Sequence, residues 1–202
     1  MTKPRFTIKR ADDTSALSHF FCGEKPIDDF IHNTKDGLAK HIELGLSKLF
    51  IVFEGQQVVA FFALSKDALI LNSADRHMIS KDSKIASALP PDDESFFWDK
   101  DKFPAVEIDY FAVSEHKRYS HIGSALIGHI IDEVAQDSLS ATLFITVEAY
   151  DTRDYSAVGF YKKCGFKLSE SGQVRNQSMM IDTDLIPTTT RMYIPVIPST
   201  AK

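Results

Sequence analysis

The fold is decided by the stretch Val113-Ser114-Glu115-His116-Lys117-Arg118-Tyr119-Ser120-His121-Ile122-Gly123-Ser124-Ala125-Leu126. The residues that lead into it, 105–113, are rich in β-branched and aromatic side chains and predict a strand. The residues that follow place apolar side chains on one helical face, at Ile122, Leu126, Ile127, Ile130, Ile131 and Val134. The stretch therefore joins a strand to a helix through a short polar loop.

The first turn of that helix favours an anion. Its backbone N–H groups have no partners within the helix, and the positive end of the helix dipole adds to their attraction for negative charge. Arg118 supplies a full charge just before the helix, and Gly123 lets a ligand approach the backbone closely. A strand-to-helix loop can equally need a glycine only to make the turn. This stretch alone is therefore compatible both with a phosphate-binding site and with a simple turn.

A second segment, 154–166, reads Asp-Tyr-Ser-Ala-Val-Gly-Phe-Tyr-Lys-Lys-Cys-Gly-Phe and predicts a short helix with a Gly-Phe stop. Together the two segments resemble the GNAT superfamily of N-acetyltransferases. That family has a strand ending in Ala-Val, then Arg-x-x-Gly-x-Gly, and later Asn-x-x-Ala-x-x-x-Tyr-x-x-x-Gly-Phe. The matching positions are Phe111 to Val113, Arg118, His121, Gly123, Asp154, Ala157, Tyr161, Gly165 and Phe166. The resemblance is strong over 105–170 and looser elsewhere.

Two positions depart from the family pattern. His121 stands where the family has its first glycine, and Asp154 stands where it has asparagine. His121 either crowds a pyrophosphate or donates a hydrogen bond to it, and the sequence leaves both open.

The resemblance implies an α/β GNAT fold, with a mixed, mostly antiparallel central sheet, splayed central strands and flanking helices. It also implies acetyl-CoA as the cosubstrate. Its pantetheine arm would lie between the strand ending at Val113 and the strand 143–148, and its pyrophosphate at the helix start. The residues implied in binding it are Phe111, Ala112, Val113, Arg118, Tyr119, Ser120, His121, Ile122, Gly123, Ser124 and Asp154.

Amine acetylation needs a base that frees the nucleophile and an acid that protonates the leaving thiolate. The resemblance implies Tyr161 as the acid, because an ordinary tyrosine pKa of about 10 leaves it protonated near pH 7. Glu107 matches the catalytic glutamate of the histone-acetylating branch, and Glu148 on the neighbouring strand is the fallback. The alternatives are that Tyr161 is a core aromatic and that Glu107 is only a solvated acid.

Composition limits the other possibilities. The 202 residues carry 23 basic and 28 acidic side chains, so the net charge of -5 does not favour nucleic acid or an anionic membrane. The sequence has no signal-peptide core and no apolar run near the ~20 residues that a bilayer requires, so we expect no membrane contact and a cytoplasmic protein. Cys22 and Cys164 are expected to be free thiols, and no Cys/His cluster predicts a metal site.

We expect one domain over 1–202 with an insertion at about 73–104. The pattern predicts strands at 6–9, 48–54, 58–65, 105–113, 142–149 and 191–196, with a hairpin turn at 55–57. It also predicts a helix that runs from Ile27 toward His41. The insertion is expected to carry a short helix around 83–89 and to cover the acceptor side, or else its aromatic residues patch the core.

The N-terminal residues resemble one branch of the superfamily. The segments Phe20-Phe21-Cys22-Gly23, Ile27-Asp28-Asp29-Phe30 and Arg191-Met192-Tyr193 are similar to those of bacterial toxins that acetylate the amino group of aminoacyl-tRNA. This resemblance implies aminoacyl-tRNA and a small DNA-binding antitoxin as partners. The acidic net charge and the insertion speak against it, because tRNA binding calls for a basic face.

Three functions therefore stay open. The first is an acetyl-CoA-dependent N-acetyltransferase that moves an acetyl group to a primary amine by direct transfer. The second is toxin-type acetylation of aminoacyl-tRNA, and the third is a catalytically silent domain that binds acyl-CoA. A homodimer is left open as the assembly.

Overall fold

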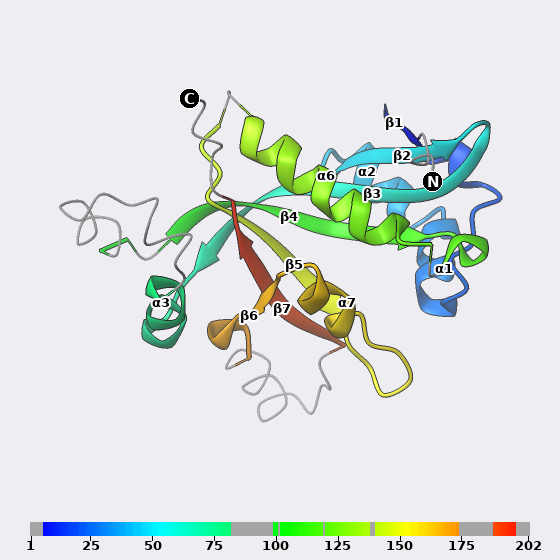
Figure 1. Ribbon diagram of the computed structural model, residues 1–202. Helices are drawn as coiled ribbons and strands as arrows, with labels where there is room; N and C mark the ends of the chain where they lie inside the picture. The colour runs from blue at the N-terminus through cyan, green and yellow to red at the C-terminus, as the bar shows by residue number, and fades with distance from the viewer. Residues whose placement is uncertain are drawn as a thin grey trace. The chain divides into compact units, whose positions relative to one another are not determined.

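The computed structural model describes residues 6–81, 99–100, 102–118, 120–137, 140–173 and 188–196. These residues belong to two compact units, one formed by 1–65 and 108–127 and the other by 66–107 and 128–202. The strands form a seven-stranded sheet in the order β1-β2-β3-β4-β5-β7-β6 (Figure 1). The pairs β1–β2, β2–β3, β5–β7 and β6–β7 are antiparallel, so the predicted mixed α/β, mostly antiparallel sheet is confirmed.

The first unit holds the N-terminal strands and the polar loop that precedes Ile122. Its elements are β1 (Phe6–Ala11), η1 (Ser15–Leu17), α1 (Lys25–His32), α2 (Leu38–Glu43), β2 (Lys48–Glu54), most of β3 (Gln57–Ile70), the end of β4 (Lys102–Val113), η3 (Glu115–Lys117) and the start of α6 (Ile122–Gln136). The predicted hairpin is confirmed: Gly55, with φ of 63°, makes the turn between β2 and β3.

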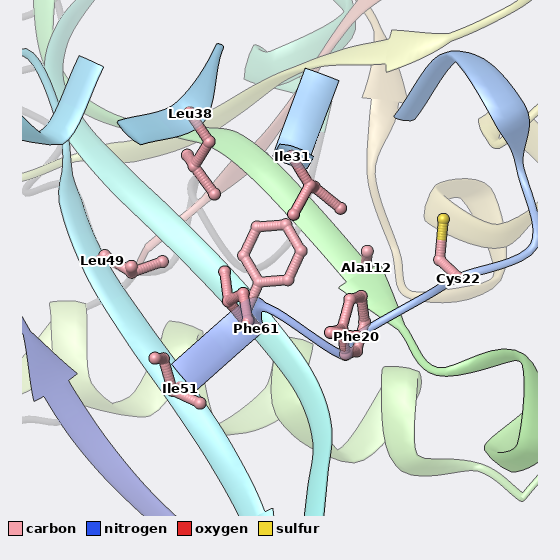
Figure 2. Packing of buried hydrophobic residues seen from close by; sticks show 9 residues of the cluster. Phe20, Cys22, Ile31, Leu38, Leu49, Ile51, Phe61 and Ala112 are labelled. Carbon is pink, nitrogen blue, oxygen red and sulfur yellow. The ribbon is translucent and has the colours of Figure 1, made fainter. Parts of the chain in front are cut away.

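The core of the first unit packs the α1–α2 region against the strands (Figure 2). Alternate residues of β2, Leu49 and Ile51, point into it, as the period of a strand requires. Phe20 meets Phe61 edge to face, with ring centroids 5.4 Å apart. The buried residues of this core are Leu17, Phe20, Cys22, Ile31, Leu38, Leu49, Ile51, Phe61 and Ala112.

The predicted single helix from Ile27 to His41 is wrong, because the segment forms two helices. Asn33 ends α1 in an extended conformation, and its side-chain oxygen accepts from the N–H groups of Lys35 and Asp36 at 2.9 and 3.2 Å. Gly37 then begins α2 so close to α1 that a Cβ there would lie 2.2 Å from the Phe30 carbonyl oxygen. A local side-chain turn and a close approach of backbone therefore override the apolar spacing.

The second unit holds the C-terminal strands. Its elements are the remainders of β3, β4 and α6 with α3 (Ser73–Ser80), β5 (Phe144–Tyr150), α7 (Val158–Lys163), β6 (Lys167–Leu168) and β7 (Thr189–Pro195). Its buried core consists of Leu69, Leu71, Ile79, Phe103, Ala105, Phe144 and Tyr193. Helix α3 occupies the start of the insertion expected at about 73–104, and the helix expected around 83–89 lies outside the described residues.

Asp75 joins α3 to the helical turn that begins at Glu170. Only 1% of Asp75 is exposed, and its carboxylate accepts from the N–H groups of Glu170 and Ser171 at 2.9 and 3.2 Å. A carboxylate at this position satisfies N–H groups that the helical turn leaves without partners, and it complements the dipole.

We expect Asp75→Ala to lower the free energy of unfolding by about 2–4 kcal/mol, since it removes a buried carboxylate that two part-buried N–H groups use as their acceptor. Urea denaturation followed by circular dichroism measures this difference. The control is Asp29→Ala, which removes an exposed ion pair to Lys25 and should cost less than about 1 kcal/mol. Equal losses in the two variants would contradict the capping role of Asp75.

The structure also bears on the state of the cysteines and on the presence of a membrane-spanning helix. Neither cysteine forms a disulfide bond, and burial raises the pKa of the Cys22 thiol to about 12, so it stays protonated at neutral pH. No helix within the described ranges is long and apolar enough to cross a membrane.

Candidate functional site

The loop between β4 and α6 is held by the backbone of the first unit. The N–H of Ser114 donates to the Val59 carbonyl at 2.9 Å, and that of Glu115 donates to the Phe21 carbonyl at 3.1 Å. The N–H of Ala125 donates to the His121 carbonyl at 3.1 Å, so His121 immediately precedes α6. The N–H groups at the start of α6 therefore have no acceptors within the helix and are available to an anion.

His121 adopts a backbone conformation typical of glycine. Its φ is 61°, and it is the one residue other than glycine with positive φ among the described residues. The family pattern has glycine at this position, and positive φ is the conformation that glycine adopts most readily. A side chain in this conformation costs on the order of 1 kcal/mol. The imidazole is exposed.

We expect His121→Gly to leave the free energy of unfolding unchanged or to raise it by up to about 1 kcal/mol, because the left-handed strain disappears. His121→Val should lower it by about 1–2 kcal/mol, since a β-branched residue tolerates positive φ poorly. Chemical denaturation of the two variants measures both effects. Equal stability of the glycine and valine variants would show that the loop relaxes to another conformation.

Arg118 is tied to the N-terminal segment of the same unit. Its Nη2 donates to the Cys22 carbonyl at 2.5 Å and to the Glu24 carboxylate at 2.7 Å. Gly23 lies against this pair, because a Cβ on it would be 3.1 Å from Glu115 Oε2 and 3.5 Å from Arg118 Nη2. With φ of 82°, Gly23 also needs the freedom of glycine. Arg118 therefore fixes the loop as well as bringing charge to it.

The carboxylate of Asp28 orders the same N-terminal segment. It accepts from the N–H of Cys22 at 2.8 Å and from that of Gly23 at 3.0 Å. These contacts give a physical reason for the Cys-Gly and Ile-Asp patterns noted in the sequence: they shape the turn on which Arg118 rests. The sequence did not predict this role, because the contacts depend on the fold.

The structure places most of the predicted cosubstrate-binding residues in the first unit. Ala112 and Ile122 are buried, so they can contribute only backbone groups, while Phe111, Val113 and Gly123 are half-buried. The others, Arg118, Ser120, His121 and Ser124, are exposed. Tyr119 lies outside the described residues, and Asp154, in the second unit, is exposed in a bend before α7.

Tyr161 lies on α7 in the second unit and is 5% exposed. Its ring meets those of Phe160 and Phe166 edge to face, with centroids 5.1 and 5.3 Å away. Burial raises the pKa of Tyr161 well above its ordinary value, so the hydroxyl keeps its proton at any working pH. Among the described residues, none forms a hydrogen bond with this hydroxyl, and a buried hydroxyl without a partner is unusual in a folded protein.

The helix that carries Tyr161 ends as the sequence predicted. The N–H of Phe166 donates to the Tyr161 carbonyl and that of Gly165 to the Lys162 carbonyl, each at 3.0 Å. Gly165 has φ of 95°, the left-handed conformation that this type of helix ending requires. The Gly-Phe stop therefore fixes the end of α7 just beyond Tyr161.

The two candidate bases lie together in the second unit, and both contact Nη1 of Arg191. Arg191 Nη1 donates to Glu107 Oε1 at 3.1 Å and to Glu148 Oε1 at 3.4 Å, and its Nη2 pairs with Asp67. The sequence reasoning missed Arg191 and Asp67 as partners. Acidic residues within three predominantly apolar strands were the available signal, because strands that are neighbours in a sheet bring such residues together.

Asp109, two residues beyond Glu107 on β4, has a different role. Its carboxylate accepts from the hydroxyl groups of Ser47 and, at 2.8 Å, Ser65. These contacts connect β4 to β3 and to the residue before β2 within the first unit. Asp109 is therefore occupied by structural hydrogen bonds.

Solved structures of similar fold include bacterial toxins. AtaT complexed with acetyl-methionyl-tRNAfMet matches with a TM-score of 0.62 and 19% identity over 95% of each chain. AtaTR bound with acetyl-CoA matches with a TM-score of 0.62 and 18% identity over 95% of this chain and 94% of that chain. A tyrosine-to-phenylalanine mutant of KacT matches with a TM-score of 0.62 and 16% identity over 95% of each chain. At these identities the likeness concerns the fold.

Sequence comparison gives the family. No curated protein matches the chain. The model of the acetyltransferase (GNAT) family matches residues 16–166, which include both motifs, the N-terminal segment that holds Arg118, and Tyr161. The chain therefore belongs to the GNAT family of acetyltransferases.

Proposed function

We propose that the chain transfers the acetyl group of acetyl-CoA directly to a primary amine, with Tyr161 as the acid. The observation that carries this proposal is the buried Tyr161 hydroxyl, which burial keeps protonated and which has no hydrogen-bond partner among the described residues. Such a group is suited to donate its proton to a thiolate as the thioester bond breaks. Acetyl-CoA as the cosubstrate agrees with the family.

The proposed reaction moves protons at both ends. The acceptor ammonium gives one proton to the Glu107 carboxylate, directly or through a water molecule, and its nitrogen attacks the thioester carbonyl carbon. As the carbon–sulfur bond breaks, the sulfur takes the proton of the Tyr161 hydroxyl and the nitrogen loses its second proton to solvent. Tyr161 then regains a proton from solvent and Glu107 releases one, so the products are an amide, free CoA and one proton. Glu107 and Tyr161 end the cycle as they began it. Glu148 is the alternative base.

The first unit is proposed to bind the phosphates of acetyl-CoA. The N–H groups at the start of α6, from Ile122 to Ser124, meet the pyrophosphate, and the half-buried Gly123 allows its close approach. The exposed Ser124 adds a hydroxyl donor. Backbone groups of Phe111 and Val113 are proposed to hold the pantetheine arm as a further strand does.

A second candidate specifies the acceptor as the amino group of aminoacyl-tRNA. The observation that favours it is the match, over 95% of each chain, to AtaT complexed with acetyl-methionyl-tRNAfMet. AtaT has also been solved bound to the C-terminus of the antitoxin AtaR. The net charge of -5 requires that any tRNA-binding face be a local concentration of basic residues. Under this candidate a small antitoxin is the expected protein partner.

The decisive experiment gives labelled acetyl-CoA to wild-type protein with two acceptors in parallel. One is bulk aminoacyl-tRNA, and the other is a panel of small amines and peptide N-termini. Label on tRNA alone would establish the second candidate, and label on amines or peptides alone would establish a metabolic or protein acetyltransferase. No transfer to any acceptor, with acetyl-CoA still bound, would overturn the proposed function in favour of a silent acyl-CoA-binding domain.

A further inference from the structure

One guanidinium group joins carboxylates from three other strands of the second unit. Arg191 lies on β7, directly opposite Glu148 on β5. Its two terminal nitrogens contact Glu148, Glu107 on β4 and Asp67 on β3. The order of the sheet there is β3-β4-β5-β7, so four neighbouring strands each contribute one charged side chain.

The fold makes room for this arginine. Gly172 is buried against its stem, and a Cβ on Gly172 would lie 2.4 Å from Arg191 Cβ and 3.0 Å from its Cγ. The N–H of Ser169 donates to the Arg191 carbonyl at 3.0 Å, so the turn that carries Gly172 is fixed to β7. Backbone and glycine together therefore restrict the path of the side chain toward the carboxylates.

Three carboxylates contact one guanidinium in this group, and the side chains are only 13% to 25% exposed. Burial lowers the pKa of Arg191, but the attraction of Asp67, Glu107 and Glu148 outweighs burial and raises it, so the guanidinium stays charged. Like charges this close would otherwise favour the retention of a proton on a carboxylate. The positive charge of Arg191 opposes this.

We propose that Arg191 is a positioning residue of acetyl transfer, which holds the carboxylates of Glu107 and Glu148 in place and ionised, ready to accept the proton of the amine. This inference rests on the proposed function, because it needs one of these glutamates to be the base. A positively charged partner within hydrogen-bonding distance keeps a carboxylate ionised to lower pH. Arg191 thereby sets the pH at which turnover begins.

Two hydroxyl groups and two further acids lie near Arg191 and its partners. Asp67 contacts Nη2 of Arg191 and pairs with no other basic group among the described residues. It also accepts a hydrogen bond from the Thr146 hydroxyl. Thr189 donates to the second oxygen of Glu148 at 3.1 Å. On the turn that packs against the Arg191 stem, Glu170 is exposed, and the Asp75 carboxylate is occupied by two backbone N–H groups. The described residues contain no group arranged to hold a metal ion.

The test compares pH profiles of kcat/KM for one amine acceptor in wild type, Arg191→Met, Arg191→Lys and Asp67→Asn. The amine ionises identically in all four, so any movement of the acid limb comes from the protein. Arg191→Met should move the acid limb of the pH profile to higher pH by about one unit or more. Arg191→Lys keeps the positive charge and should return the limb most of the way to its wild-type position. Asp67→Asn removes a negative charge beside the glutamates and should move the limb to lower pH.

A purely structural role predicts another result. Arg191→Met would then lower activity equally at every pH, in proportion to a lower Tm, and Asp67→Asn would not move the limb; these outcomes would overturn the inference. If Arg191→Met does not fold, the test rests on Asp67→Asn: a movement of its acid limb to lower pH supports the inference, and an unmoved limb overturns it. Calorimetry of acetyl-CoA binding should give an unchanged Kd in all variants. Absence of acetyl transfer by the wild type would overturn the proposed function and this inference together. Acetyl transfer by the wild type, with the acid limbs of the variants at the same pH as in the wild type, would overturn only the inference.

Discussion

Tyr161→Phe is expected to lower kcat for acetyl transfer by about 100- to 1000-fold while the Kd for acetyl-CoA stays within about twofold of wild type. The substitution removes one hydroxyl and keeps the ring together with its edge-to-face contacts with Phe160 and Phe166. The hydroxyl has no partner among the described residues, so its loss should also leave the free energy of unfolding unchanged or slightly higher. A large effect on turnover without one on stability is the signature of a group used in the reaction.

The matched control is Tyr150→Phe, which makes the same chemical change at a half-buried tyrosine of β5. Its kcat should stay within about threefold of wild type, or about 0.7 kcal/mol in the barrier. Single-turnover measurements with labelled acetyl-CoA separate the chemical step from release of products. If Tyr161→Phe and Tyr150→Phe lose activity equally, or if Tyr161→Phe weakens acetyl-CoA binding in proportion to kcat, Tyr161 is a packing residue and the proposed acid is wrong.

The pH dependence gives a further check on the same residue. Burial raises the pKa of Tyr161, and a buried hydroxyl that is neutral in the folded protein adds no pH dependence to folding below the ordinary tyrosine pKa of about 10. Activity should therefore show no alkaline loss due to Tyr161 below about pH 10. Such a loss in wild type that disappears in Tyr161→Phe would show that the hydroxyl is more accessible to water than its burial indicates.

The elements that the sequence predicted well are those whose signals are local. The strand 105–113 and the helix from Ile122 follow from residue type and apolar spacing, and the ending of α7 follows from Gly165. The break between α1 and α2 could not be predicted in the same way. It depends on where the Asn33 side chain makes its hydrogen bonds and on the contact of Gly37 with the Phe30 carbonyl, which apolar spacing does not register.

The residues of the candidate site show the same difference between local and long-range signals. The positions of Tyr161 and of the loop before Ile122 follow from motifs within short stretches of chain. The role of Arg191 does not, because its partners come from strands distant in sequence and the space for its stem depends on Gly172. The conformation of His121 is intermediate: the family pattern indicated glycine there, but only the backbone shows that histidine keeps the positive φ.

Gly123→Glu is expected to weaken acetyl-CoA binding by about 100-fold or more, which corresponds to about 2.7 kcal/mol. The new carboxylate stands in the first turn of α6, where we propose that the pyrophosphate binds, and it opposes that anion by charge and by bulk. The same charge suits the positive end of the helix dipole, and glutamate forms helix better than glycine does. The variant should therefore be as stable as wild type or more so while losing the ligand.

Gly128→Glu is the control, because it makes the same change further along the same helix. A Cβ on Gly128 would meet nothing within 4 Å, so the substitution should fold well. It lies beyond the first turn, where the N–H groups already have partners in the helix, and the Kd for acetyl-CoA should stay within about threefold of wild type. Isothermal titration calorimetry with thermal unfolding of the same samples measures both quantities. If Gly123→Glu binds acetyl-CoA as wild type does, the pyrophosphate lies elsewhere; if both variants lose binding equally, the effect is one of net charge and the start of α6 is not the site.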